Sequence, residues 1–464
     1  MAVRPRAQCY YTQPTSGSTT AYIKGTIDIV TADAQAAPPM VVPRSEHNIS
    51  RKNISQGALK VLYRLNEAGH EAYLVGGGVR DLLLESHPKD FDVATSAKPE
   101  EVRALFGNSR LIGRRFRLVH VRFGREIVEV ATFRAGQSGD EAAERTTADG
   151  RLLSDNVYGT LEEDAARRDF TVNSLYYGVR DFSVLDFAGG LQDLESGQLR
   201  LIGDPETRYR EDPVRILRAI RFAAKLDFDL SPETAQPIAG LSHLLSDIPP
   251  ARLFDEVLKL LMSGHGTASF ERLRAFDVFR FLFPGTNAHL SEDPQGIVTR
   301  LLTQAMINTD ARLAAEKPVT PGFLFAALLW PPVQAAEEKM REAEDSEPHT
   351  ILERAAAGVL AAQIQSVSLP RRFSQMARDI WAMQSRLERR RRKDAIALLG
   401  HPRFRAAYDF LVLRAEAGEP VSEFAEWWTT FQADDPEGRE LAIKALPSGG
   451  RRRRGPRRRR PRVA

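Results

Sequence analysis

Hydrophobic and polar positions divide the first half of the chain into short elements of two kinds. Apolar residues at helical spacing predict helices, and alternation with polar residues predicts strands. Glycines at 69 and 76–78 interrupt these patterns, as expected for helix stops and turns. The predicted elements are a helix at 50–68, a strand at 72–75, a helix opening at 79–84, a strand around 90–92, and strands within 105–124 and 125–134. A mixture of α and β structure is therefore expected in this half.

Helical spacing dominates the second half of the chain. The segment 209–226 shows a strong helical pattern. Within it Pro213 suits the first helical position, and Asp212 before it is then the natural N-cap. Beyond residue 230, helical spacing with few strand signals occurs at 253–264, 323–330, 351–365 and 404–418. We therefore expect this part to be all-α.

Two segments show no sustained period. Residues 1–45 are rich in Ser, Thr, Ala and Pro, which predicts a mobile arm. Residues 135–160 are polar and glycine-rich, which predicts a flexible loop near any site formed by the first half.

Length and composition limit the class of protein. The chain has 464 residues, of which 42% are hydrophobic, and a chain of this length is expected to form about two to four domains. Its one cysteine, Cys9, excludes an internal disulfide and a zinc site built only from thiolates of this chain. No apolar run reaches the length of a membrane span, and the first residues lack the apolar core of a signal peptide. We expect a cytoplasmic protein without a transmembrane segment.

The positive charge is concentrated near the C-terminal end. Nine of the 65 basic residues lie between Arg451 and Arg462, and without these nine the remaining 56 would face 61 acidic residues. Such a segment cannot bury apolar area, which predicts disorder. Its functional interpretation is a sequence-independent contact with RNA phosphates; the alternatives are acidic membrane lipid, or no role beyond solubility. The candidate RNA-binding residues are Arg451, Arg452, Arg453, Arg454, Arg457, Arg458, Arg459 and Arg460.

A glycine turn follows the strand predicted at 72–75. Gly76, Gly77 and Gly78 fall where this strand passes into a helix, and residues without a Cβ let backbone N–H groups approach phosphate oxygens. Arg80 would add a fork of charged donors. The spacing fits neither the GxGxxG dinucleotide loop nor the GxxxxGK[ST] phosphate loop, so a nucleotide site of another kind is indicated.

Two aspartates lie shortly after this turn, with one residue between them. Side chains alternate in extended chain, so Asp90 and Asp92 should point to one side and Phe91 into the core. Two parallel carboxylates suit Mg²⁺, which binds one or two carboxylates together with substrate phosphates; Mn²⁺ is the second choice. Taken alone, the turn or the pair is more often structural, but their order and closeness favour a nucleotidyl-transfer site.

Further candidates each have a structural alternative. Glu129 is either a third acidic group beside the two aspartates or a salt-bridge partner of Arg134 or Arg122. Asp169 either orients a ribose or a metal ion, or acts as a cap or salt-bridge partner. Arg168, next to it, is a candidate for the triphosphate.

Arginines recur every three residues along the helix predicted at 209–226. Arg215, Arg218 and Arg221 form a slowly drifting stripe opposite the apolar residues. A solvated face is the usual meaning of such a stripe, and a site for a base, a triphosphate or RNA is the alternative. Asp212 is explained as either an N-cap or a ligand, and both can hold at once.

Other features of the second half favour structural roles. The run RRRRK at 389–393 is more often a solvated helix face than a phosphate contact. Trp427 and Trp428 lie at helical spacing with Phe424 and Phe431, which favours core packing over stacking on bases. The histidines lack metal-ligand spacing, and no HD dipeptide indicates an attached phosphohydrolase.

The ordered motifs together resemble a known family. LVGGGVRD, KDFDVAT, RRDFTVNSL and EDPVRILRAIRFAAKL are similar to motifs of the class II nucleotidyltransferases, which include CCA-adding tRNA nucleotidyltransferases and bacterial poly(A) polymerases. The segments LIGRRFRLVHVRFG, IPPARLFDEVLKLL and HPRFRAAYDFLVLRAE, and the arginine-rich end, are similar to the bacterial poly(A) polymerases in particular. The resemblance then covers most of the chain from residue 45 onward.

The resemblance implies a role for each matching residue. The implied roles are metal binding for Asp90 and Asp92, a third essential carboxylate for Asp169, phosphate contacts for Gly77, Arg80 and Arg168, base recognition for Asp212 and Arg215, and a further nucleotide contact for Arg218. A similar pair of acid and arginine serves adenine in some relatives and cytosine in others, so base choice is not readable from these residues.

The resemblance also implies an α+β fold with an N-terminal nucleotidyltransferase head, built on a small mixed sheet, and an all-α neck, body and leg. The expected boundaries are a disordered arm at 1–45, the head at 46–190, the neck at 191–270, the body and RNA-binding region at 271–440, and the disordered arginine-rich tail at 441–464.

The implied function is template-independent addition of poly(A) to RNA 3′ ends from ATP, with release of pyrophosphate and promotion of RNA turnover. A CCA-adding enzyme is the alternative, which the arginine tail and the extended similarity argue against. A non-catalytic RNA-binding adaptor is the alternative of another class, and it should tolerate loss of Asp90. Single-stranded RNA and ATP are the expected partners, and the family implies RNA-degradation machinery and an RNA chaperone.

Overall fold

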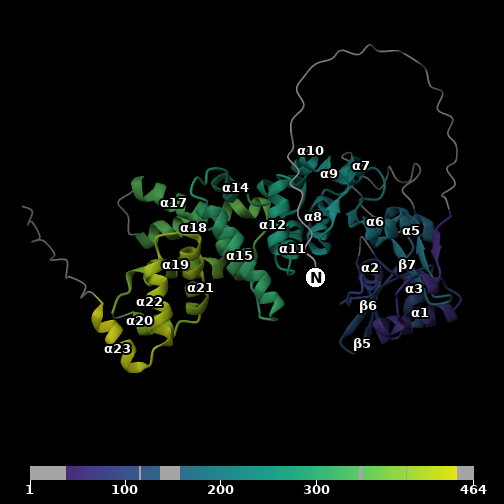
Figure 1. Cartoon of the computed structure of the whole chain (residues 1–464), viewed down its shortest axis with the longest axis horizontal. Coiled ribbons are helices and arrows are strands. Elements are labelled where there is room, and N and C mark those ends of the chain that lie inside the picture. The colour runs from purple at the N-terminus through teal and green to yellow at the C-terminus, as the bar shows by residue number, and fades with distance from the viewer. Residues whose placement is uncertain (1–37, 114–116, 136–156, 344–347, 393, 447–464) are drawn as a thin grey trace, which may run out of the picture. The chain divides into compact units, whose positions relative to one another are not determined.

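The computed structural model describes residues 38–113, 117–135, 157–343, 348–392 and 394–446 (Figure 1). The mixed part contains strands β1 (Met40–Val42), β2 (Ala72–Val75), β3 (Asp92–Thr95), β4 (Ser109–Ile112), β5 (Leu118–Phe123), β6 (Glu126–Thr132), β7 (Leu175–Gly178), β8 (Val184–Asp186) and β9 (Gln198–Leu199), with helices α1 (Gln56–Glu67), α2 (Gly77–Leu83), α3 (Pro99–Leu105), α5 (Leu161–Arg167) and α6 (Gly190–Ser196).

The rest of the described chain is helical apart from β10 (Asp229–Leu230). Its helices are α7 (Pro205–Glu211), α8 (Val214–Leu226), α9 (Pro232–Ala235), α10 (Ile238–Leu241), α11 (Pro250–Leu261), α12 (Gly266–Ala275), α13 (Phe279–Leu282), α14 (Pro284–Ser291), α15 (Ile297–Ala314), α16 (Pro321–Leu328), α17 (Trp330–Ala343), α18 (Pro348–Ser366), α19 (Arg371–Arg389), α20 (Ala395–Leu399), α21 (Phe404–Ala417), α22 (Ser422–Ala433) and α23 (Pro436–Ala445). The predicted α+β fold is confirmed.

Strands β1 to β8 form one mixed sheet in the order β1-β8-β7-β2-β3-β6-β5-β4. Neighbouring strands are antiparallel except β3 and β6, which run parallel. The register of this parallel pair places Asp92 beside Glu129. Two widely separated acidic positions are therefore brought together by the sheet itself.

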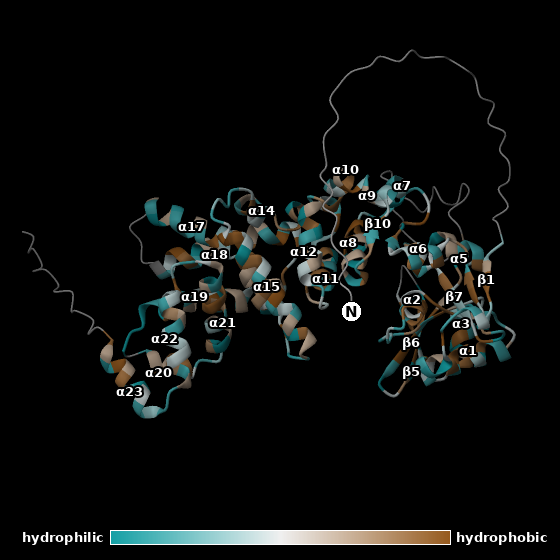
Figure 2. Cartoon of the chain, in the orientation of Figure 1, coloured by the Kyte–Doolittle hydropathy of each residue, from teal (hydrophilic) through white to brown (hydrophobic). Residues whose placement is uncertain are grey.

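The two faces of the sheet have different surroundings. Val93 of β3 and Val130 of β6 belong to the main hydrophobic core, on the face that packs with α1 and α3. Their neighbours point to the opposite face, because side chains alternate along a strand. There Ala94 packs in a smaller cluster with Leu161 and Ala165 of α5, while Asp92 and Glu129 remain exposed. Figure 2 shows hydrophobic and hydrophilic stretches alternating along the helices and strands.

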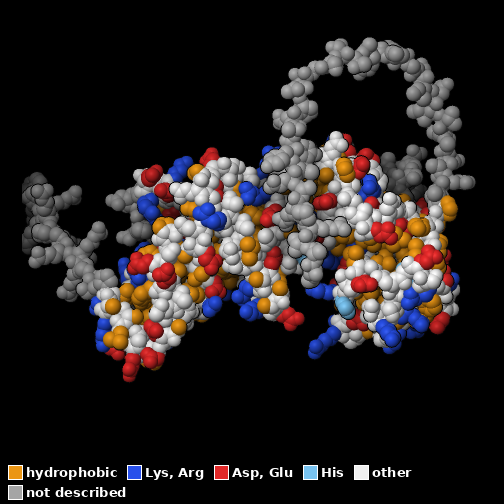
Figure 3. All heavy atoms as spheres, viewed as in Figure 1, with side chains coloured by type: hydrophobic (Ala, Val, Ile, Leu, Met, Phe, Trp, Pro, Cys, Tyr) orange, Lys and Arg blue, Asp and Glu red, His pale blue; other side chains and the backbone are white. Residues whose placement is uncertain are grey.

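The helical part has two apolar clusters. The main core continues through α8, α11, α12, α15, α16 and the first half of α19. A second cluster is formed by the end of α19 with α20, α21 and α22. On the surface, acidic and basic side chains are interspersed over these helices (Figure 3). In the described residues, no helix is both long enough and apolar enough to cross a membrane.

Several predicted boundaries need correction. The arm predicted at 1–45 extends too far, because Met40–Val42 pair with β8 as an edge strand; residues 1–37, including Cys9, lie outside the described residues. The tail predicted from 441 begins too early, because α23 continues to Ala445. All the described chain belongs to one compact unit, so the boundaries between head, neck and body stay a prediction.

Local signals explain two other differences. The helix predicted at 50–68 begins at Gln56, because the Ser55 side chain accepts a hydrogen bond from the Ala58 N–H and caps it there. The alternating stretch at 105–124 contains two strands, β4 and β5, which pair antiparallel. Gly113, with φ of +83°, follows β4 directly. The loop predicted at 135–160 lies outside the described residues at 136–156.

Candidate active site

A glycine turn lies at the junction of β2 and α2. Gly76 has φ of +75°, a conformation that residues with a Cβ rarely adopt. A Cβ placed on Gly76 would lie 3.9 Å from Nη1 of Arg168 and 4.0 Å from Oδ2 of Asp92. The backbone of the turn therefore faces a guanidinium group and a carboxylate at the same point.

Asp92 begins β3, and Asp90 lies two residues before it. Both are exposed, while Phe91 between them is 7% exposed and belongs to the main core. The predicted alternation of these three residues is thus confirmed. Glu129 lies beside Asp92 across the parallel strands, and its Oε1 is 3.2 Å from Nε2 of His120. His120 is a partner that neither sequence alternative for Glu129 includes.

The negative charge of Asp90, Asp92 and Glu129 is only partly compensated by Arg168. Desolvation by the surrounding protein, the Glu129 carboxylate and the Asp90 carboxylate together raise the pKa of Asp92 from 3.8 to about 6, although Arg168 acts in the opposite direction. Water still reaches Asp92, so this carboxyl is partly enclosed rather than buried. An arrangement of this kind favours an added cation.

The described protein groups do not form a complete metal site. No three His, Cys, Asp or Glu side chains in the described residues are grouped closely enough to hold a metal ion. Asp90 and Asp92 instead offer the one or two carboxylates with which a protein typically binds Mg²⁺ when substrate phosphates supply other ligands.

Arg168 is held in place by two partners. Its Nε donates to the Tyr176 hydroxyl at 2.8 Å, and its Nη2 donates to Oδ2 of Asp164 at 2.9 Å. The Tyr176 hydroxyl in turn donates to Asp164 at 2.8 Å, and the Arg168 guanidinium lies 5.1 Å from the Tyr176 ring centroid. Burial alone would lower the pKa of Arg168, but Tyr176 and Asp164 raise it above its ordinary value. Its Nη1, which faces Gly76, has no hydrogen-bond partner among the described residues.

Asp169 is bound by groups from two separate segments. Its Oδ1 accepts hydrogen bonds from the Phe170 N–H at 2.8 Å and from the Asn173 amide at 3.2 Å. Its Oδ2 accepts from Nε of Arg218 at 2.9 Å and also from Nη2 of the same guanidinium. Burial would raise the pKa of Asp169, but Arg218 and these hydrogen bonds outweigh it, and the pKa lies below its ordinary value. The salt-bridge alternative for Asp169 is therefore realised.

Arg80 points into the protein rather than toward solvent. It is 1% exposed. Its guanidinium donates to Oδ1 of Asp81 and, through Nη1, to Oδ1 of Asn173 at 2.6 Å. Its Nη2 lies 3.3 Å from the position that a Cβ on Gly77 would occupy. The buried Arg80 guanidinium therefore packs against Gly77 and supports the glycine turn from the protein interior.

Helix α8 contacts this assembly along one side. Arg218 binds Asp169, and Nζ of Lys225, two turns farther on, lies 3.2 Å from Oδ2 of Asp81. Between them, the Phe222 ring lies within 5.4 Å of the Arg218 and Arg80 guanidinium groups. The arginine stripe is thus not a solvated face at these positions.

The N-terminal end of α8 carries the predicted base-recognition pair. Asp212 accepts a hydrogen bond from the Val214 N–H at 3.3 Å. The predicted N-cap position is nevertheless wrong by one residue, because α8 begins at Val214 with Pro213 as its N-cap residue, and Asp212 follows the last residue of α7. Its other oxygen accepts from Arg252 at 2.7 Å. Arg215 donates to Oε2 of Glu211 at 2.7 Å. Both members are half-buried and already paired within the protein.

Sequence reasoning missed the residues that hold these side chains. The sequence indicates no functional role for three of them, although all lie within or beside the motif that contains Asp169: Asp164, Asn173 and Tyr176. Arg208, which is 9% exposed, donates through Nη2 to the backbone carbonyls of Arg167 and Arg168 at 2.7 and 2.8 Å. One signal was available for Asp164: it lies four positions before Arg168, the spacing at which an acid and an arginine on one helix face can pair.

The other candidates have structural partners or lie outside the described residues. Trp428 is buried and donates to the Leu387 carbonyl, and Trp427 stacks on Phe431, so the core-packing interpretation is confirmed. In the run 389–393, Arg390 pairs with Glu423 and Arg392 donates to the Leu446 carbonyl. The arginines from 451 to 460 lie outside the described residues.

Comparisons with known proteins agree with this architecture. The chain matches three family models, described as "Poly A polymerase head domain" at residues 72–200, "Probable RNA and SrmB- binding site of polymerase A" at 227–290 and "Polymerase A arginine-rich C-terminus" at 344–462. Among solved structures, it is similar to the Bacillus stearothermophilus CCA-adding enzyme in complex with CTP, with 27% identity, a TM-score of 0.51 and coverage of 82% of both chains. The fold and the site define a nucleotidyltransferase with a helical C-terminal part.

The relatives separate two branches of this class. The chain is 52% identical to poly(A) polymerase I of Salmonella typhimurium over 92% of its own length and 94% of that protein. It is 41% identical to the CCA-adding enzyme of Lactobacillus helveticus over only 46% of its own length and 52% of that enzyme. The chain belongs to the bacterial poly(A) polymerase I family of class II nucleotidyltransferases, and it is a polynucleotide adenylyltransferase.

Proposed function

We propose that this site extends RNA 3′ ends with adenylate from ATP, using Asp90, Asp92 and Arg168 around the glycine turn. The RNA 3′-oxygen forms a bond to the α-phosphorus of ATP as the bond between that phosphorus and the bridging oxygen breaks. Pyrophosphate leaves, and the hydroxyl proton passes to solvent. The observation that supports this proposal most directly is the approach of Asp92 and Arg168 to one backbone position, Gly76.

Asp90 and Asp92 would hold Mg²⁺, or Mn²⁺ as the second choice. The donor set fits these ions, because both groups are hard oxygen ligands. The pKa of Asp92 is raised first by desolvation and then by the neighbouring carboxylates, so a bound cation would stabilise its ionised form. Glu129 is the candidate third carboxylate of the metal site, and its exposure and its place beside Asp92 support this role. To bind the metal, its carboxylate would have to leave His120 and move toward the two aspartates. When bound, the metal would supply charge that activates the RNA hydroxyl and stabilises the leaving oxygens.

The arginines would act in two ways. Arg168 presents Nη1 toward the turn while Asp164 and Tyr176 hold its other donors, which suits an immobilised phosphate ligand. Arg80 would contact phosphates only after a change in its buried hydrogen bonds, so we assign it first to support of Gly76 and Gly77. Asp169 would be the third essential carboxylate, and its pair with Arg218 fixes its position before the nucleotide arrives.

Asp212 and Arg215 would recognise the base. An acceptor and a donor at one helix end suit the exocyclic amine and a ring nitrogen of adenine. Their pairs with Arg252 and Glu211 would have to rearrange when a base binds. The arginine-rich end would contact the RNA backbone, and RNA turnover is the expected consequence of tailing.

The test is Mg²⁺-dependent extension of a short unstructured RNA, with ATP and CTP supplied singly, beside a tRNA that lacks its terminal CCA. Long products with ATP on the plain RNA support the proposal. Addition restricted to the tRNA and ending after CCA would replace it with the CCA-adding alternative. A folded Asp90→Ala variant, verified by circular dichroism, should lose activity. If it keeps its activity, Asp90 is not a metal ligand.

A further inference from the structure

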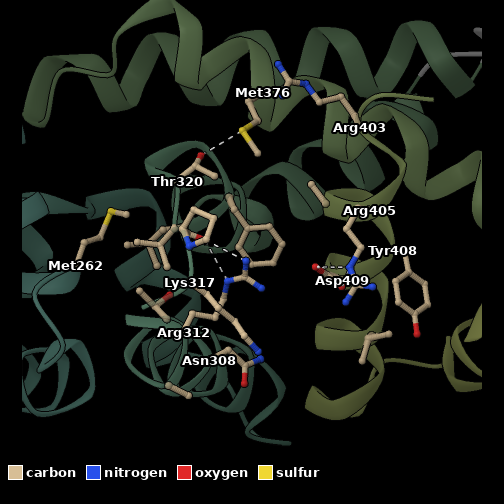
Figure 4. A pocket seen from close by; sticks show the side chains of 18 of the residues that line it. Met262, Asn308, Arg312, Lys317, Thr320, Met376, Arg403, Arg405, Tyr408 and Asp409 are labelled. Atoms are coloured by element: carbon tan, nitrogen blue, oxygen red, sulfur yellow. Dashed lines mark hydrogen bonds and ion pairs between the residues drawn. The ribbon is translucent and has the colours of Figure 1, made fainter. Parts of the chain in front are cut away.

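A groove lies in the helical part of the chain and uses none of the residues of the candidate active site. It opens between α15, the segment 315–320, α19 and α21 and has a volume of about 610 Å³ (Figure 4). Pockets of roughly 300–1,000 Å³ hold small organic ligands, so a nucleotide unit fits this space. Only Met262 of its lining falls within residues 227–290, which match the RNA-binding model.

One wall of the groove carries cations without acidic partners. Arg312, near the end of α15, donates through Nη2 and Nε to the Pro318 carbonyl at 3.0 and 3.3 Å. This contact fixes the guanidinium without neutralising it. Lys317 is exposed on the same wall. Within the described residues, neither Arg312 nor Lys317 forms a salt bridge.

The opposite wall carries two further arginines. Arg405 pairs with Asp409 one turn along α21 at 2.9 Å, and both lie near the solvent. Arg403, just before α21, lies 3.5 Å from Asp379 of α19. Exposed pairs of this kind contribute little to stability, so their arginines can turn to another anion at low cost. Figure 4 shows Arg405 and Asp409 facing the side on which Arg312 and Asn308 lie.

The floor between these walls is apolar and includes one accessible aromatic ring. Phe323 is half-buried, and its ring packs edge-on against Phe410 at 6.1 Å between centroids. Met376, whose sulfur accepts a hydrogen bond from the Thr320 hydroxyl, also lines the groove and packs against Gly322, the residue before Phe323. The remaining apolar lining includes Leu324 and Val412.

We propose that this groove binds a segment of single-stranded RNA, with a base against Phe323 and Met376 and phosphates beside the cations of the two walls. A cationic groove with an aromatic floor is the usual arrangement for binding single strands without sequence preference. Four Lys and Arg residues line it against two acids, Asp409 and Glu416, so its charge favours a polyanion. The proposal rests on the proposed function, because the RNA that is extended is the ligand of the groove.

The test uses a charge-reversed double variant, Lys317→Glu with Arg405→Glu, and a matched control. Both changes are at exposed positions. The control is Lys339→Glu with Arg341→Glu on α17, which likewise combines an exposed lysine with an arginine in a one-turn ion pair, here with Glu337, and lies outside the groove lining. Circular dichroism and the melting temperature verify that both variants fold.

Two measurements separate the groove from the catalytic site. For a long unstructured RNA, the groove variant should bind about tenfold more weakly near 0.1 M salt, with a salt slope shallower by about 1.4, as expected when two phosphates are no longer neutralised. A primer of a few nucleotides is too short to reach from the catalytic site to the groove. The groove variant should therefore extend this primer as fast as the wild type does. The control variant should match the wild type in both measurements.

The outcomes distinguish failure of the groove from failure of the proposed function. If the wild type extends RNA but the groove variant binds the long RNA with unchanged affinity and salt slope, the groove proposal is overturned, and an acidic protein partner becomes the better occupant. If the wild type extends no RNA, the proposed function fails instead. Photo-crosslinking of 4-thiouridine RNA to the wild type should label the peptide containing Phe323, and labelling only elsewhere would also overturn the groove.

Discussion

Arg218 of α8 binds the carboxylate of Asp169, although 49 positions separate the two residues in the sequence. The ion pair is enclosed, since the Asp169 side chain is 13% and the Arg218 side chain 34% exposed. It joins Asp169 of the RRDFTVNSL motif to helix α8, which contains Arg215 and begins two residues after Asp212. The position of a candidate catalytic carboxylate therefore depends on a helix outside the sheet.

Loss of this pair should destabilise the protein in a pH-dependent way. Arg218→Ala leaves Asp169 enclosed without its cation, and we expect a loss of about 1–3 kcal/mol, less than for a fully buried pair because Arg218 is partly exposed. The pKa of Asp169 lies below its ordinary 3.8 in the folded protein, so the pair contributes stability above that pH and loses it as pH falls through the folded pKa.

Thermal unfolding of the wild type and Arg218→Ala from pH 7 to pH 3 measures this effect. The difference in melting temperature should be largest at neutral pH and should narrow in acid. Arg218→Lys, which keeps the charge but not the two-donor fork, should fall between them. A difference that does not change with pH would assign the loss to packing against Phe222.

Asp92→Asn should abolish elongation and leave RNA binding nearly unchanged. The substitution removes a candidate metal ligand and changes no candidate phosphate contact. Primer extension and filter binding with the same RNA measure the two properties. Elongation near the wild-type rate would remove Asp92 from the metal site.

The same substitution should stabilise the metal-free protein. The folded pKa of Asp92 is raised to about 6 from 3.8, so in the absence of metal this group destabilises the fold increasingly as pH rises through that range. Asp92→Asn removes the charge, and its melting temperature in EDTA should exceed that of the wild type at pH 8 but not at pH 4. Added Mg²⁺ should raise the melting temperature of the wild type more than that of the variant. A wild type that is the more stable at pH 8 in EDTA would contradict the raised pKa of Asp92.

Tyr176→Phe should weaken nucleotide binding more than it slows the reaction. The hydroxyl bonds both Arg168 and Asp164, whereas the ring beneath the guanidinium is kept. Loss of about 1 kcal/mol of hydrogen bonding corresponds to a rise of about fivefold in KM for ATP, with little change in kcat. Tyr177→Phe is the control, since Tyr177 is also buried but packs in the main core on the other face. Equal effects of the two substitutions would mean that the hydroxyl has no specific role.

Truncation after Gly450 should weaken RNA binding and flatten its salt dependence. The deletion removes nine arginines, and the slope becomes shallower by about 0.7 for each phosphate of a single strand that is no longer neutralised. Titrations at several salt concentrations measure this slope. An unchanged slope would show that the segment does not contact RNA.

Short-range patterns predicted the features that depend on neighbouring residues. The alternation of side chains along a strand predicted that Asp90 and Asp92 point to one side and Phe91 into the core, and in the structure both aspartates are exposed and Phe91 is buried. The contacts that position the site residues join segments far apart in the sequence, so they depend on the tertiary fold instead. Arg80 reaches Asn173 across 93 positions, and Glu129 meets Asp92 through strand order. Sequence spacing contains no signal for either contact, so an Arg80 that donates to a bound phosphate could not be distinguished from one that donates to Asn173 inside the protein.

Helix α8 presents Arg215 and Arg218 about 4.5 Å apart along its axis, because each residue advances about 1.5 Å. Arg215 belongs to the proposed base-recognition pair, and Arg218 holds Asp169. A rotation or shift of α8 that adapted the first group to a different base would displace the second from its carboxylate. In evolution, then, base preference on this scaffold can change by exchanging side chains on the helix more readily than by moving the helix.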